Sequence, residues 1–157
     1  MAALAMTIDR RMRDDSGSAS LEFITVGMIL LVPLVYLVLA LSAVQGGALA
    51  VEGAARQAAR VYVLAADDAA ARAGAARAVE VALADYGLEN QAVTVQVDCE
   101  TPDRCLTPRS GVTVTVRVVV PLPLVPDVLS LGNVAALPVE GTATQIVSRF
   151  WHAERTE

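Results

Sequence analysis

The sequence predicts an α+β protein. A long N-terminal transmembrane helix continues into a second helix, and both pack on a small antiparallel sheet of about three strands. Residues 23–51 contain no charged side chain, and this stretch exceeds the roughly 20 apolar residues that a helix needs to cross a bilayer core. An alanine-rich segment of high helix propensity follows. After Gly87 apolar and polar residues alternate, as in half-buried strands.

These patterns divide the chain into three predicted regions. Residues 1–17 form a polar leader peptide, residues 18–66 a transmembrane and extended N-terminal helix, and residues 67–157 an extracytoplasmic α+β domain. We expect a kink at Pro33, because proline removes one backbone hydrogen bond from a helix. Glu52 and Arg56 are four residues apart, in the order that favours an ion pair on a helix.

The second helix is predicted to begin at an Asp67-Asp68 cap and to run to about Tyr86, where Gly87 ends it. The two aspartates also suggest a metal site, but helix capping explains them more simply. The expected buried face consists of Val79, Leu83 and Tyr86.

Two alternating segments, 93–97 and 112–118, predict a hairpin, and the loop between them contains Cys99 and Cys105. Two cysteines without a nearby histidine make a poor zinc site. A disulfide fits better if this region lies outside a reducing cytoplasm, and two free thiols remain the alternative.

The segment after the hairpin is less regular. Residues 121–126 contain three prolines and are excluded as a central strand, because proline cannot donate to the ladder. A short helical turn is expected at 127–131, and a third strand at 138–149 with a bend or bulge at Gly141. Phe150 and Trp151 are expected at the edge of the core, with an exposed contact patch as the alternative.

Charge and composition exclude several functions. The net charge is −5, lysine is absent and the arginines are scattered, so no nucleic acid partner is expected. His152 is the only histidine, and no nucleophile elbow or phosphate-binding loop is present. We therefore expect a protein that is not an enzyme, with no catalytic residue, metal, cofactor or small-molecule substrate. A membrane-tethered enzyme remains a rival class.

The residues beside the apolar stretch predict its orientation. Arg10, Arg11 and Arg13 precede it, whereas Arg56 and Arg60 follow it, and this small excess favours a cytoplasmic N-terminus. A disulfide in the C-terminal domain would favour the same orientation. A secretory signal peptide is the alternative, but its apolar centre would span only about 7–15 residues.

The junction before the apolar stretch is the most specific feature of the chain. After the arginines of the leader, Arg10, Arg11 and Arg13, come Gly17, Ser18 and then Glu22-Phe23, at the start of the uncharged stretch. This arrangement resembles the type IV prepilin signal, in which cleavage after the glycine frees an α-amino group. The carboxylate of Glu22 would then neutralise the amine of a neighbouring subunit, and without such a partner its burial would be costly.

Residues 16–23, Pro33 and the alanine-arginine segment 53–60 resemble the TadE family, the minor pilins or pseudopilins of the tight-adherence (Flp) pilus. The resemblance implies a pilin-like fold, a precursor in the cell membrane, and cleavage between Gly17 and Ser18 by a prepilin peptidase. It also implies assembly through Glu22 and Phe23, with other pilin-like subunits, pilus assembly membrane proteins and the lipid bilayer as partners.

Two questions stay open at this point. The chain is either such a subunit or an uncleaved single-pass anchor that presents an extracytoplasmic protein-binding domain. The small residues after the apolar stretch either allow close packing between subunits or simply reflect alanine-rich helix propensity. They are Gly46, Gly47, Ala50, Gly53 and Ala54.

Overall fold

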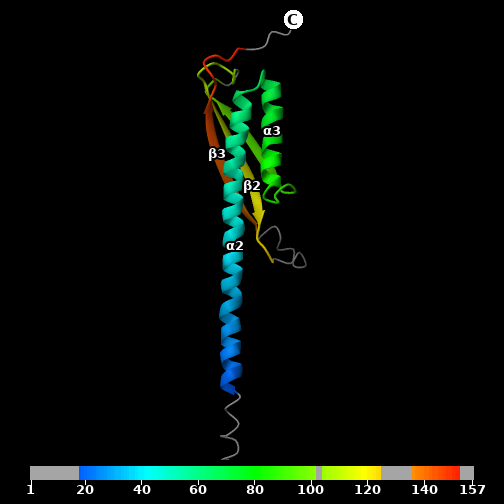
Figure 1. The fold of residues 1–157 in the computed structure, drawn as a ribbon, viewed down its shortest axis with the longest axis vertical. Helices are drawn as coiled ribbons and strands as arrows, with labels where there is room; N and C mark the ends of the chain where they lie inside the picture. Colours follow the sequence, from blue (N-terminus) through cyan, green and yellow to red (C-terminus); the bar gives the residue numbers. More distant parts are fainter. Residues whose placement is uncertain (1–17, 102–103, 125–135, 153–157) are drawn as a thin grey trace, which may run out of the picture. The chain divides into compact units, whose positions relative to one another are not determined.

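The fold is known from a computed structural model, which describes residues 18–101, 104–124 and 136–152. Its elements, shown in Figure 1, are α2 (Ser18–Val63), α3 (Asp68–Ala84), β1 (Val93–Cys99), β2 (Gly111–Pro121) and β3 (Ala136–Ile146). A long apolar helix, a second helix and a three-stranded antiparallel sheet confirm the predicted α+β class. The turn predicted at 127–131 lies outside the described residues.

The chain forms two compact units, residues 1–39 and residues 40–157. The described part of the first unit is the N-terminal portion of α2, whose large apolar side chains are nearly all exposed. Pro33 lies inside α2 and does not end it. The second unit contains the rest of α2, and buried side chains between Ala50 and Val63 contribute to its core. The C-terminal part of α2 therefore packs with the region that follows residue 67 in the sequence.

Helix α3 begins at the predicted cap and ends at Ala84, two residues before the predicted end at Tyr86. The Asp67 carboxylate accepts a hydrogen bond from the backbone N–H of Ala70 at 2.7 Å, which satisfies one of the free donors of the first turn. At the other end Gly87 has a φ of 69°, and Leu88 N–H donates to the carbonyl of Leu83 at 3.0 Å. The prediction for Tyr86 was wrong, because it is exposed; the buried residues are Ala71, Ala75, Val79 and Leu83.

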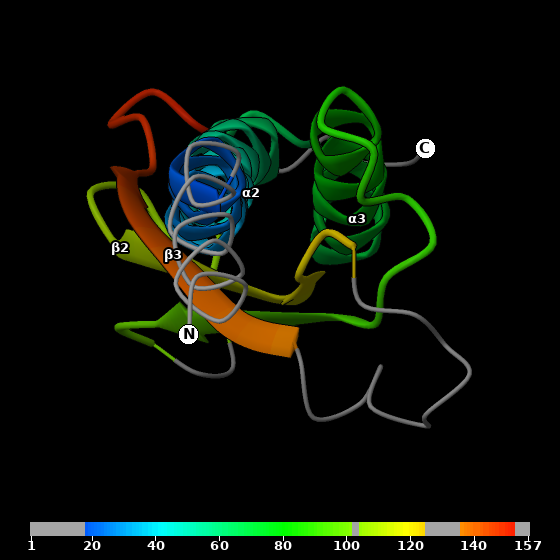
Figure 2. The same cartoon turned by 90° about the horizontal axis from the view of Figure 1, so that it is seen from below.

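The sheet has the order β1-β2-β3, with both strand pairs antiparallel. Figure 2 shows both helices on the same side of this sheet. Alternate valines of β2 face the helices and are buried, from Val112 to Val120, whereas the residues between them face away. The outer face is polar. Its strands are linked by hydroxyl pairs, Thr113 with Thr144 at 2.8 Å and Thr115 with Thr142 at 3.2 Å.

Gly141 is needed for close packing and does not mark a bulge. The β2–β3 register is continuous through the pair Val116 and Gly141, so the predicted bend was wrong. A Cβ atom on Gly141 would lie 2.5 Å from the carbonyl carbon of Val51 and 2.6 Å from the nitrogen of Glu52. The backbone of α2 therefore lies directly against β3, at a distance that only glycine permits.

The aromatic residues near the C-terminus differ in their surroundings. Trp151 packs against the core, and its indole N–H donates to the carbonyl of Ala65 at 2.9 Å, as expected for a residue at the core edge. Phe150 is 73% exposed, with the Arg149 guanidinium 4.5 Å from its ring centre, so its predicted core position was wrong. Tyr62 is fully buried, and this burial, with the nearby Asp68 carboxylate, raises its pKa.

Candidate functional site

The first candidate site is the N-terminal portion of α2. Helix α2, which lies near the N-terminus of the chain, is long and apolar enough to cross a membrane. This is consistent with a single-pass membrane protein. Glu22 lies on this helix just after its first turn, and both Glu22 and Phe23 are exposed. An exposed carboxylate beside an apolar helical surface is available to a charged group on another molecule.

The predicted cleavage junction falls at the limit of the described residues. Ser18 is the first residue of α2, and Gly17 lies outside the described residues. A cut between them would leave Ser18 at the free end of α2. The helix N-terminus carries partial positive charge, which the new α-amino group would increase, so a nearby carboxylate would be stabilising.

The small residues of α2 pack largely within this chain. Gly47, Ala50 and Ala54 are buried, and a Cβ on Gly47 would collide with the Val120 side chain of β2. Gly53 is exposed, and around Gly46 and Gly53 a Cβ would meet nothing within 4 Å. Close approach of α2 to the sheet of the same chain therefore explains why Gly47, Ala50 and Ala54 are small. Gly46 and Gly53 remain available to a partner. Glu52 and Arg56 form the expected exposed ion pair, at 2.6 Å.

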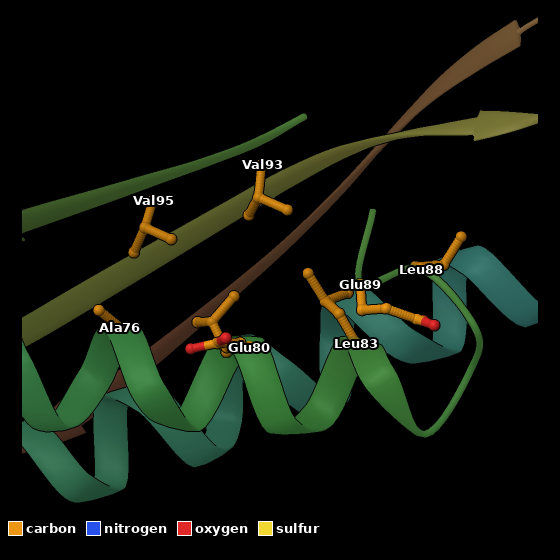
Figure 3. A pocket seen from close by; sticks show the side chains of 8 residues that line it. Ala76, Glu80, Leu83, Leu88, Glu89, Val93 and Val95 are labelled. Atoms are coloured by element: carbon orange, nitrogen blue, oxygen red, sulfur yellow. The ribbon is translucent and has the colours of Figure 1, made fainter. Parts of the chain in front are cut away.

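The second candidate site is a groove between α3 and β1, shown in Figure 3. Its cavity of about 290 Å³ is lined by apolar side chains with Glu80 and Glu89 among them. Val93 and Val95 face the helices but remain 39% and 37% exposed, because α3 covers β1 incompletely. A second cavity of about 310 Å³ continues along β1 and is lined in part by Tyr62, Arg72 and Cys105. Such a groove suits an apolar segment that carries a positive charge.

Sequence reasoning did not find this groove. The alternation of β1 predicts which side chains face the helices, but it does not report how far α3 lies from them. Among the described residues no group of three or more His, Cys, Asp or Glu side chains is arranged to hold a metal ion. His152 contacts the carbonyl of Phe150, two residues earlier, with 3.1 Å between Nδ1 and the oxygen.

Cys99 and Cys105 form the predicted disulfide, with an S–S distance of 2.08 Å. Cys99 is the last residue of β1 and pairs with Val112 of β2, so the bond closes the loop at the end of the hairpin. Cys105 is buried and belongs to the core of the second unit. The bond therefore stabilises the hairpin and holds the loop against the core.

Replacing both cysteines (Cys99→Ser with Cys105→Ser) is expected to lower the free energy of unfolding by about 2 kcal/mol, because the short loop regains its freedom in the unfolded chain. The full-length protein in detergent micelles is unfolded with urea, and Trp151 fluorescence reports the transition. Adding a thiol reductant to the unmodified protein should produce the same loss, and it should not affect the double variant. If the oxidised unmodified protein and the double variant had the same free energy of unfolding, the prediction would be contradicted.

Comparison with known proteins does not add to this description. No protein-family model, curated protein or solved structure matches the chain. The class that the fold and site define is thus a chain whose described residues form a candidate membrane-spanning helix near the N-terminus, followed by a disulfide-bonded α+β unit.

Proposed function

We propose that this chain is a membrane-inserted, prepilin-like (TadE-like) subunit that takes part in assembling a tight-adherence pilus or a related secretion apparatus. The observation that carries the proposal is the position of Glu22, a carboxylate directly before an uncharged helix that is long enough to cross a membrane. Gly17 precedes it by five residues, at the end of a leader that contains three arginines.

The proposed orientation places the N-terminus in the cytoplasm and the second unit outside it. The Cys99–Cys105 disulfide supports this orientation, because disulfides persist in oxidising compartments. The excess of arginines before the apolar stretch supports it as well. In this arrangement α2 anchors the precursor in the bilayer and later packs against other subunits.

Mature protein purified from native membranes is expected to begin at Ser18. N-terminal sequencing and intact mass measure this directly. Replacing the residue before the cut (Gly17→Leu) should leave the leader attached, whereas Gly27→Leu, a glycine with free space around it further along α2, should not affect cleavage. An intact leader on the unmodified protein would overturn the prepilin proposal.

The α3–β1 groove favours a second candidate function, that of an uncleaved single-pass anchor which presents a protein-binding domain. Both functions require the membrane span, but only the first requires cleavage. The same sequencing experiment therefore separates them.

A further inference from the structure

Among the described residues of the second unit, charged residues end at the same level on three neighbouring segments, α2, β2 and β3. On α2 the uncharged stretch ends at Val51, and the backbones of Val51 and Glu52 both lie against Gly141 of β3. Glu140 comes directly before Gly141 and forms an ion pair with Arg117 of β2, with 2.5 Å between Nε and Oε2. Beyond this level, the described residues 118–124 and 136–139 of the hairpin carry no charge.

The uncharged end of the hairpin lies beside the part of α2 that precedes Val51. Val120 packs against Gly47, and the β2 arrowhead in Figure 1 lies next to the cyan part of α2. The large apolar side chains at this end are exposed, to 61% for Leu49, 74% for Leu124 and 46% for Leu137. We call Leu124 and Leu137, the two on the hairpin, the apolar rim. An apolar patch of this kind usually marks a contact surface.

Counting residues along α2 places the apolar rim at the surface of the bilayer. A bilayer core takes about 20 helical residues, so a span that begins at Phe23 leaves the hydrocarbon near Ser42. One headgroup layer of roughly 5–7 Å takes about four more residues, which brings the helix to Gly46. Since Val120 packs against the next residue, Gly47, the continuation of β2 toward Leu124 enters the headgroup layer.

We propose that the apolar rim contacts the lipid of the extracytoplasmic leaflet and gives the second unit a membrane contact of its own. This inference rests on the membrane span in the proposed function. A bilayer is favoured over a second copy of the chain, because the charges of the described residues end at one level on α2, β2 and β3, as contact with a plane requires. Glu89 borders the α3–β1 groove together with Val93, and Val93 pairs with Val118 of β2. The hairpin continues beyond Val118, so its uncharged end extends further than the position of Glu89.

The test uses the full-length protein in phosphatidylcholine vesicles whose acyl chains are either plain or brominated, since bromine quenches indole fluorescence at short range. Leu124→Trp reports from the end of β2 and Leu137→Trp from β3. Two controls lie at the opposite end of the second unit. They are the native Trp151 indole, which bonds to Ala65, and Thr144→Trp on the polar face.

Burial of the rim by about 5–10 Å in the interface should reduce the fluorescence of the added indole, taken as each Leu→Trp variant minus the unmodified protein, by about twofold in brominated vesicles, relative to both controls. If the protein floats with the vesicles but neither variant is quenched, the apolar rim does not contact lipid, while the span remains supported. A blue shift that depends on protein concentration, without quenching, would instead indicate a second copy and would also overturn the inference. Failure to float with vesicles would overturn the proposed membrane span itself.

Discussion

Replacing Gly141 by valine is expected to lower the free energy of unfolding of the second unit by about 3 kcal/mol or more, beyond the usual range for overpacking a core. The new side chain would meet backbone atoms of Val51 and Glu52, with Cβ 2.5 and 2.6 Å away. Backbone cannot rotate aside as a side chain can, so α2 and β3 must separate. Valine otherwise favours strands, so a loss of stability would reflect this collision.

The measurement is urea unfolding of the full-length protein in micelles, followed by Trp151 fluorescence. Gly53→Ala serves as the matched control, because it adds the same kind of atom to α2 at a position where nothing lies within 4 Å. That change should raise the free energy of unfolding by about 0.5–1 kcal/mol, the helix preference of alanine over glycine. A Gly141→Val protein as stable as the original would show that α2 and β3 do not approach this closely.

Replacing Glu22 by glutamine is expected to reduce pilus or complex assembly by roughly a hundredfold or more, because the loss of one partner from a buried ion pair costs about 3–5 kcal/mol. Glutamine keeps the size of the side chain and removes its charge. The α-amino group that Glu22 would neutralise in the assembly then remains buried without a counter-charge. Membrane insertion should be unchanged, because it depends on the uncharged residues 23–51.

Assembly is measured by the yield of sheared fibres and by chemical cross-linking of the subunit in native membranes. Glu52→Gln provides the control, since it makes the same chemical change further along α2. The Glu52–Arg56 pair is exposed, so its loss should have little effect on assembly. Normal assembly with Glu22→Gln would remove the main support for the pilin proposal, and a simple membrane anchor would then be favoured.

Much of the local structure was predictable because local rules govern it. The Asp67 cap, the left-handed Gly87 and the alternating valines of β2 are each recognisable within a few neighbouring residues, and each has the predicted role. The disulfide was also predictable, because the two cysteines are close in sequence in a hairpin loop.

The features that sequence reasoning missed depend on contacts between segments far apart in the chain. Gly141 suggested a bulge, but its role comes from α2 residues about ninety positions earlier, which no local pattern reports. Tyr86 continues the apolar spacing of α3 but lies past the last helical residue, Ala84, so its side chain does not follow the buried face. The α3–β1 groove depends on the distance between two elements, and alternation within either of them does not determine that distance.

The disulfide also implies an order of events during biogenesis. A bond between Cys99 and Cys105 joins the end of β1 to the loop before β2, and a reducing compartment would keep it open. With the orientation proposed above, oxidation follows export, so the newly made polypeptide reaches the translocation channel without this covalent closure and can be threaded through it in extended form. The redox state of Cys99 and Cys105 would then indicate whether a given molecule has been exported.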